Sequence, residues 1–513
     1  MAFPLLLLVF VLPILSVPFV YFAGKKSPKT SALIVALVAL INIGLVSGTV
    51  PAVLNSANNN RYVEPYNWIP VLNNTQFALF TDGISVSIAI TSLILILAAA
   101  LFSINYMEGK KNLPVYYVLL SLLSVGLVGV FITSNLLLFY FCWELMLVPA
   151  YFIVGGWGYR ESYRAAFKLF IFTHAGAVFV LLGIGAIYMY TGTTDMFAAQ
   201  SALTSIAPDA VKWILIALTA GFAVKMAIVP VHMWLPDAHS EAPATMSALL
   251  SGVIISAGAY AIIRLSIGIV FPAVGIAFGV DFLHGLTIFG VISAFFGSLI
   301  ALVETDIKRI IAYSSIAHMG YVMFGISLFP AILANGTIIA LAEAGAVAIV
   351  GTILHLITHA VSKGLFFLSA GSVMHQTELR DVNEMGGLAG KMPYTAVTSA
   401  TAALSISGAP PFACFISEFL IFVGAFEIIG TDGFYLLPTA LMLVATVLSL
   451  AYSLRFISKV FLGQPKVTLE TVKKLLDVPM YMKIAMGILV VLIVILGVYP
   501  TLFLSLINTV KFG

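Results

Sequence analysis

Long apolar stretches recur along the whole chain, and short polar segments separate them. A helix needs about 20 apolar residues to cross the hydrocarbon of a bilayer, so each stretch can be compared with that length. An even number of crossings would place both ends of the chain on the same side. The pattern predicts an all-α polytopic protein with about fourteen membrane-spanning helices, at residues 3–23, 31–52, 82–104, 114–133, 135–155, 167–190, 211–230, 244–270, 284–303, 309–330, 338–373, 394–428, 435–462 and 479–509.

Two of these stretches, 338–373 and 394–428, are longer than one crossing requires, which predicts a bend or an interruption in one or both. The second contains Pro410 and Pro411, and Pro230 lies at the end of the seventh stretch. Proline removes a hydrogen bond inside a helix and kinks or breaks it. The freed carbonyl groups need protein or water as partners at membrane depth, so each break predicts a hydrated cavity beside a charged residue.

Composition supports this class of protein. Of 513 residues, 61% are hydrophobic and 9% are charged, and the mean hydropathy is +1.11. Soluble domains carry roughly 25% charged residues, so soluble enzymes and nucleic-acid-binding proteins are excluded. The first apolar stretch lacks a basic flank and a cleavage site, so we expect it to stay in the mature chain. Cys142 and Cys414 lie far apart without CxxC spacing, and we expect no metal and no cofactor in this chain.

Basic residues predict the orientation. On the predicted topology, nearly all lysines and arginines of the loops share one face, and only Arg61, Lys212 and Lys511 fall on the other. The positive-inside rule makes the basic face cytoplasmic and places both termini outside. Lys168 and Arg264 lie close to span ends, where they are expected to extend towards water.

Three charged residues lie deep inside apolar stretches. Glu144 occurs in "LLLFYFCWELMLVPAYF", Lys225 in "ILIALTAGFAVKMAIVPVHMW" and Lys363 in "GTILHLITHAVSKGLFFLSAG". A charge at the bilayer centre costs about 3 kcal/mol even on the lenient insertion scale, and such residues usually face the protein interior and carry function.

Further ionisable residues follow in the later stretches. His355 and His359 precede Lys363 by eight and four residues, so all three share one face of a helix. His318 and Glu418 lie in neighbouring stretches. Histidine titrates near neutral pH, so this group can pass protons stepwise, whereas a purely structural histidine would only satisfy a carbonyl group or a hydroxyl. The register of three groups on one face favours the proton path.

Several long segments resemble the antiporter-like membrane subunits of respiratory complex I and the related subunits of membrane-bound hydrogenases and multisubunit cation/proton antiporters. They include "LLLFYFCWELMLVPAYFIVGGWG", "GFAVKMAIVPVHMWLPDAHSEAPATMSALLSG", "HLITHAVSKGLFFLSAGSV" and "LSISGAPPFACFISEFLIF", within residues 136–422. The combination looks most like the M-type subunit of complex I. The resemblance implies two inverted five-helix repeats, at spans 4–8 and 9–13. The chain then divides into residues 1–110, 111–270, 271–463 and 464–513.

The resemblance also implies roles. Glu144 and Lys225 form the charged pair of the first half, His318 and His359 are polar positions on a proton axis, and Glu418 is its terminal acid. "LPDAHSEAPA" (residues 235–244) is the family's loop after the first broken helix, and its charged residues are either solvated cytoplasmic groups or a proton entry.

One position departs from the M-type pattern. The eighth span carries Ser256 where those subunits have a central lysine. Hydroxyl groups, ordered water and His318 are then left to bridge the two halves, or the chain mainly couples its neighbours.

The function expected on this basis is proton translocation in a redox-driven pump of a prokaryotic cell membrane. Dissociation of the Glu144–Lys225 pair would send a proton along His318, His355, His359 and Lys363 to Glu418. Other antiporter-like and small membrane subunits are the expected partners, together with peripheral redox subunits that carry iron–sulfur, flavin or nickel–iron centres. Two alternatives are a subunit of a multisubunit Na⁺/H⁺ antiporter and a structural spacer.

Overall fold

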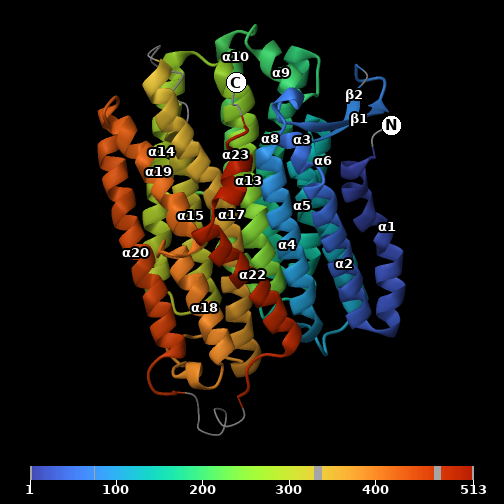
Figure 1. Cartoon of the computed structure of the whole chain (residues 1–513), viewed down its shortest axis with the longest axis vertical. Helices are drawn as coiled ribbons and strands as arrows, with labels where there is room; N and C mark the ends of the chain where they lie inside the picture. Colours follow the sequence, from blue (N-terminus) through green and yellow to red (C-terminus); the bar gives the residue numbers. More distant parts are fainter. Residues whose placement is uncertain (1–2, 74, 329–337, 467–474, 511–513) are drawn as a thin grey trace.

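The chain forms a bundle of long helices in a computed structural model that describes residues 3–73, 75–328, 338–466 and 475–510 (Figure 1). Helices satisfy their own backbone hydrogen bonds, which lipid cannot do, so apolar stretches of this length fold as helices. Within the described residues, twelve helices are long and apolar enough to cross a membrane. The prediction of an all-α polytopic membrane protein is confirmed.

The first half of the chain contains all the strands that the described residues form. Its elements are α1 (Leu5–Lys26), α2 (Pro28–Ser47), α3 (Val50–Val53), η1 (Ser56–Asn58), β1 (Tyr62–Ile69), β2 (Thr75–Thr81), α4 (Gly83–Tyr106), α5 (Leu113–Ile132), α6 (Leu136–Leu145), α7 (Leu147–Trp157), α8 (Ser162–Thr191), α9 (Met196–Leu203), α10 (Pro208–Met226), α11 (Leu235–Glu241), α12 (Ala244–Leu249), η2 (Leu250–Ile254), α13 (Ile255–Ala261), η3 (Ile262–Val270) and η4 (Phe271–Ala273).

The second half is helical throughout its described residues. Its elements are α14 (Ile276–Val303), α15 (Ile307–Leu328), α17 (Ile338–Thr377), η5 (Leu388–Gly390), α18 (Pro393–Ile406), α19 (Ala413–Ile429), η6 (Gly433–Tyr435), α20 (Leu436–Phe461), α22 (Met480–Val498) and α23 (Thr501–Ile507). The end of the predicted span 309–330 and Lys511 lie outside the described residues.

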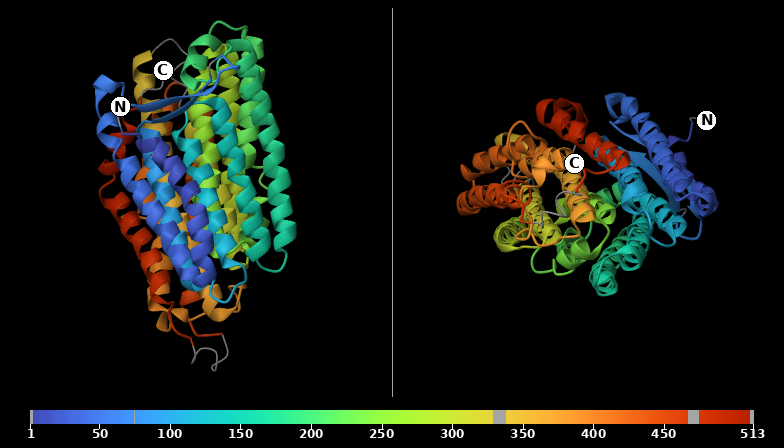
Figure 2. Two further views of the ribbon diagram at one scale, coloured as in Figure 1. Left: turned by 90° about the vertical axis from the view of Figure 1, so that its right-hand side faces the viewer. Right: turned by 90° about the horizontal axis from the view of Figure 1, so that it is seen from below.

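The twelve long apolar helices correspond to twelve of the fourteen predicted spans. The other two predicted spans contain interruptions. Span 211–230 is α10, which ends at Met226 and carries three charged residues, and span 394–428 is divided into α18 and α19. The total of fourteen crossings therefore stays a prediction. Both described ends of the chain lie towards the same end of the bundle, which an even number of crossings requires (Figures 1 and 2).

Helix α17 is the central element. It is continuous, unlike the neighbouring interrupted span, and it packs against α4, α12, α15, α18, α19 and α22. Viewed from below, the N-terminal helices (blue) and α18–α20 (orange) lie on opposite sides of the bundle (Figure 2). A residue on α17 can therefore contact elements from both halves.

A hairpin of β1 and β2 lies between the predicted spans 31–52 and 82–104. Glu64 on β1 is buried and accepts hydrogen bonds from the backbone N–H groups of Leu6 and Leu7, both at 3.0 Å, in the first turn of α1. Tyr62 and Tyr66 also donate to this carboxylate. Burial, together with the Glu64 carboxylate, raises the pKa of each tyrosine to about 12. The hairpin thus anchors the N-terminal helix.

Replacing Glu64 with alanine is expected to loosen α1 at a cost of about 1–3 kcal/mol, since it leaves buried donors without an acceptor. Limited proteolysis near the N-terminus should become faster. Glu108→Ala, at an exposed loop carboxylate, provides the matched control. Equal cleavage rates in the two variants would contradict this role for Glu64.

Arg264 does not extend to water, and the expectation for this residue was wrong. Its guanidinium forms a buried ion pair with Asp82 at 2.7 Å, and the two side chains are 6% and 4% exposed. Asp82 precedes α4, so the pair joins α4 to η3 across 182 residues. Lys168 lies nearer the surface, where it pairs with Asp237 at 2.7 Å.

Candidate functional site

The predicted site residues fall into two groups. Glu144 on α6 and Lys225 on α10 belong to the first half, and the second group comes from α15, α17 and α19. Lys225 is 2% exposed, whereas the side chain of Glu144 is 25% exposed. The residues of the second group are His318, His355, His359, Lys363 and Glu418, all of which are buried.

Lys225 lies in an aromatic pocket around Trp143, the residue that precedes Glu144 in the chain. Its ammonium donates to the backbone carbonyl of Trp143 at 2.9 Å and lies 4.0 Å from the centre of the Trp143 ring. Phe139 and Phe222 pack against the same indole. A cation–π contact in a desolvated site stabilises the charged ammonium by about 2 kcal/mol.

Glu144 pairs with a residue that sequence reasoning missed. Its Oε2 lies 3.2 Å from Nδ1 of His174 on α8, and the His174 ring stacks on Phe170. The salt bridge predicted between Glu144 and Lys225 is not present between these two described side chains, because each has another partner. His174 was detectable in principle, since it is an ionisable residue inside the predicted span 167–190.

The chain leaves helical geometry after α10, and the side chain of Trp234 bonds the end of this helix. Ala227 has a positive φ of 60°, and the Val229–Pro230 peptide bond is cis, as is Pro410–Pro411 at the second break. Trp234 donates its indole N–H to the Val224 carbonyl at 2.9 Å, which satisfies a group near the helix end.

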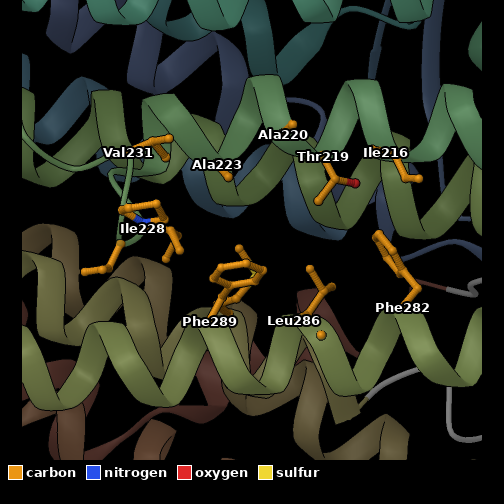
Figure 3. Close-up of a pocket in the computed structure, with 13 residues that line it drawn as sticks. Ile216, Thr219, Ala220, Ala223, Ile228, Val231, Phe282, Leu286 and Phe289 are labelled. Carbon is orange, nitrogen blue, oxygen red and sulfur yellow. The ribbon is translucent and has the colours of Figure 1, made fainter.

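A cavity of about 320 Å³ lies beside this break, between α10 and α14 (Figure 3). Ile216, Ala223, Leu286 and Phe289 are among the residues that line it, and nearly all of its lining is apolar. Its one hydroxyl, on Thr219, already donates to Ser266. Apolar side chains from the two helices line this space, so it does not supply the polar surface that the predicted hydrated cavity needs, and that cavity stays a prediction.

Two separate serine contacts lie between the eighth span and Lys363. Ser256 donates to the carbonyl of Gly252 in its own helix and makes no cross-helix hydrogen bond among the described residues. Ser251, one turn earlier, bonds Ser315 of α15 at 2.8 Å. The adjacent Ser314 accepts a hydrogen bond from the ammonium of Lys363 on α17. The π-helical segment η2 holds Ser251, and such segments often occur at functional sites.

Replacing Ser251 with alanine is expected to slow proton translocation roughly fivefold, the effect of losing one hydrogen bond of about 1 kcal/mol in the path. Ser256→Ala is the matched control, because Ser256 bonds only its own helix. The measurement is proton uptake by vesicles that contain the assembled complex. Equal rates in the two variants would contradict a path through Ser251.

Hydrogen-bond partners allow a tautomer to be assigned to His355 and to His318. We assign the Ser417 proton to the Cys414 carbonyl, and the Ser417 oxygen then accepts from Nδ1–H of His355 at 2.9 Å. Nε2 of His355 therefore carries a lone pair, and it lies 3.2 Å from Nδ1 of His318.

The tautomer of His318 is assigned from its hydrogen-bond partners in the same way. We assign the Ser449 proton to the Ile406 carbonyl at 3.3 Å rather than to Nε2 of His318 at 3.5 Å, so Ser449 accepts from the Tyr452 hydroxyl at 2.8 Å. The Tyr452 oxygen then accepts from Nε2–H of His318 at 3.2 Å. This leaves a lone pair on Nδ1 of His318, opposite the one on His355.

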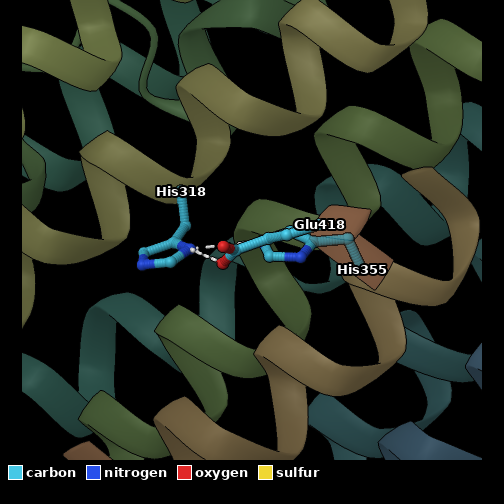
Figure 4. Close-up of side chains that lie close together, drawn as sticks. All are labelled: His318, His355 and Glu418. Carbon is cyan, nitrogen blue, oxygen red and sulfur yellow. Dashed lines mark hydrogen bonds and ion pairs between the residues drawn. The ribbon is translucent and has the colours of Figure 1, made fainter. Parts of the chain in front are cut away.

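Glu418 completes this cluster. Its Oε1 lies 3.9 Å from Nδ1 of His318 and has no hydrogen-bond partner among the described residues (Figure 4). His359 packs within 6.2 Å of the His355 ring, measured between centroids, and its ring nitrogens are also without partners there. Three acceptor atoms therefore converge with no donor between them, an arrangement that a proton or another cation would satisfy.

The "LPDAHSEAPA" segment is not a solvated loop. His239 is fully buried and stacks on Phe367, and Glu241 is 9% exposed. Helix α11 packs against α8, α12 and α15, which explains this burial. Asp237 remains partly exposed and pairs with Lys168 and Arg309.

A network of ion pairs surrounds this segment. Arg380 pairs with Asp306 at 2.7 Å and with Glu241 at 3.1 Å. Burial acts to lower the pKa of Arg380, but the two carboxylates outweigh it and raise the pKa. Arg309 and the backbone N–H of Thr305 lower the pKa of Glu304 against the opposing effect of burial. These ion pairs join the loops of both halves.

Comparison with known proteins places the chain in one family. The sequence pattern described as "NADH:quinone oxidoreductase/Mrp antiporter, TM" matches residues 133–449. NADH-quinone oxidoreductase subunit M of Rickettsia prowazekii is 30% identical over 505 residues, which cover 98% of this chain and 96% of the relative. The subunit M of Pseudomonas aeruginosa is 33% identical, covering 82% and 79% of the two chains.

Solved structures share the fold. A chain of the archaeal membrane-bound sulfane sulfur reductase is 26% identical with a TM-score of 0.80, covering 96% of this chain and 76% of its own length. A chain of the Mrp complex from Dietzia is 22% identical with a TM-score of 0.83, and the match covers 99% of this chain and 97% of that chain. A chain of respiratory complex I from Thermus thermophilus is 22% identical with a TM-score of 0.81, and the match covers 98% of this chain and 97% of that chain. The chain is a membrane subunit that belongs to the NADH:quinone oxidoreductase/Mrp antiporter family.

Proposed function

We propose that this chain is the proton-translocating, antiporter-like subunit of a redox-driven pump of the complex I type in a prokaryotic cytoplasmic membrane. The observation that carries the proposal is the row of buried ionisable side chains across the bundle, from Lys225 through Lys363 to Glu418. Buried charges at membrane depth are costly, so a whole row of them points to ion movement. The family relatives named NADH-quinone oxidoreductase subunit M support it.

The first step takes place at Glu144 and Lys225. In the arrangement described above, Glu144 pairs with His174, and Lys225 binds the Trp143 carbonyl. We assign this arrangement to the dissociated state of the Glu144–Lys225 pair. A change in an adjacent subunit would move the carboxylate towards Lys225 and stabilise its charge, and the reverse movement would release a proton.

The proton then crosses the centre of the protein. Ser251 bonds Ser315, and the neighbouring Ser314 bonds Lys363, so the proton would pass from the first pair to the second. From Lys363 the path continues along α17 to His359 and on to the cluster of His318, His355 and Glu418. Moving one charge through about 100 mV requires about 2.3 kcal/mol, which one charge-assisted hydrogen bond can supply.

The remaining parts of the proposal concern assembly. The chain would cross the membrane fourteen times with both termini outside, as two inverted five-helix repeats at residues 111–270 and 271–463. Its partners would be other antiporter-like and small membrane subunits. Peripheral redox subunits would hold the iron–sulfur, flavin or nickel–iron centres, and this chain would contribute no redox group.

A second candidate is a subunit of a Na⁺/H⁺ antiporter, which the family description and the Mrp fold match favour. The two functions differ in what drives proton movement. A redox pump moves protons when an electron donor is added, whereas an exchanger needs a sodium gradient.

The test uses inverted membrane vesicles that contain the assembled complex. We expect an electron donor to acidify the vesicle lumen in sodium-free buffer. Acidification that requires sodium, and that a sodium gradient alone can drive, would contradict the redox pump and support the exchanger.

A further inference from the structure

The atoms at the end of the proposed path also suit a metal ion. Nδ1 of His318, Nε2 of His355 and a carboxylate oxygen of Glu418 all lie within 4.8 Å of one another. In the tautomers assigned above, the two nitrogens lie 3.2 Å apart and present lone pairs to each other, and Oε1 of Glu418 has no partner among the described residues. Two histidines and one carboxylate are a common ligand set for Zn²⁺.

The spacing of the nitrogens fits tetrahedral coordination. Zinc–nitrogen bonds of about 2.0–2.1 Å at a tetrahedral angle place two ligand nitrogens roughly 3.3–3.4 Å apart. The two histidine nitrogens here are 3.2 Å apart. The His318–Glu418 separation of 3.9 Å is longer than this value, and rotation of the Glu418 side chain can shorten it.

The surroundings of both histidines match those of metal ligands. Ligand histidines usually donate their second ring N–H to an oxygen, which fixes the tautomer and the ring orientation. Ser417 accepts from Nδ1–H of His355, and Tyr452 accepts from Nε2–H of His318. The ring orientation that a metal would need therefore exists without it (Figure 4).

We propose that His318, His355 and Glu418 form a binding site for Zn²⁺ or a chemically similar divalent transition metal. A bound ion would occupy the acceptor atoms that the proposed path uses, and it would block proton translocation through this chain. This consequence rests on the proposed function, whereas metal binding itself does not.

The experiment measures zinc bound to the purified complex by equilibrium dialysis and elemental analysis, without electron donor. Because the complex will hold zinc elsewhere, the informative quantity is the difference between variants. The wild type is expected to bind one more zinc per complex than Glu418→Gln, whose amide is a poor ligand of the same shape. Ser417→Ala, which removes the oxygen that orients His355, is expected to weaken this site about 10–100-fold.

Two controls make the outcome decisive. Glu427→Gln changes an exposed carboxylate on the same helix, and His284→Gln changes a histidine that pairs with Asp432 in another part of the bundle. Both are expected to leave the zinc bound at the proposed site unchanged. Equal zinc content in wild type and Glu418→Gln, or loss of the site only in His284→Gln, would overturn the proposal.

X-ray absorption spectroscopy at the zinc edge provides a second measurement. The difference between wild type and Glu418→Gln should show only nitrogen and oxygen ligands at about 2.0–2.2 Å. Sulfur ligands would overturn the assignment. If zinc does not bind while Glu418→Gln still stops proton uptake, the metal site fails and the proposed function stands. If zinc binds and the same variant pumps normally, the proposed function fails.

Discussion

Replacing Lys363 with methionine is expected to lower proton translocation by roughly 100-fold, which is the scale of one proton-transfer group. The ammonium of Lys363 is fully buried and bonds only Ser314 and the Ile311 carbonyl among the described residues, and we propose that it passes the proton from the serine hydroxyls to the histidines on its own helix. Methionine has a similar length and cannot carry a proton. The rate of lumen acidification after addition of an electron donor measures the effect.

The thermal stability of the complex distinguishes a loss of proton translocation in Lys363→Met from misfolding of the variant. An unpaired buried charge is costly, and its removal is expected to leave the thermal transition of the complex unchanged or raise it. The Ser314 hydroxyl keeps the Ile311 carbonyl as its partner in the variant. Lys391→Met, at an exposed lysine, is the control. Normal acidification in Lys363→Met would remove this residue from the path.

Replacing Glu144 with glutamine is expected to stop redox-driven proton uptake while the complex stays assembled. The carboxylate has two partners in the proposed cycle, His174 in the dissociated state and Lys225 in the associated state, and an amide cannot form either ion pair. The expected loss is again about 100-fold. Proton uptake and subunit content should be measured on the same vesicles.

Two further variants sharpen this result. Glu161→Gln changes a carboxylate in a loop and is expected to pump normally. His174→Gln removes the ion-pair partner of Glu144 but keeps a hydrogen-bond donor, so we expect a partial loss that depends on the pH of the assay. Unchanged pumping in Glu144→Gln would contradict the proposed first step.

Much of the fold could be predicted from the sequence because lipid leaves few choices. Every long apolar helix corresponds to a stretch whose length alone identified it. The hairpin at residues 62–81 could not be predicted in this way, since strands of that length lack a membrane-spanning signal and Pro65 argues against a strand. The Asp82–Arg264 pair was also missed, because its partners are 182 residues apart.

The candidate site was predictable in part for a related reason. Helical spacing placed His355, His359 and Lys363 on one face, and the structure has them on the central helix α17. Contacts between helices were not visible in that pattern. They determine that His174 pairs with Glu144 and that Ser251, and not Ser256, reaches α15.

Protons driven by a redox reaction are proposed to pass through this chain. The ratio of protons translocated to electrons transferred, measured in the same vesicles for wild type and Glu144→Gln, tests that claim most directly. The account predicts that the ratio falls in the variant while the electron donor is still oxidised. An unchanged ratio would contradict it.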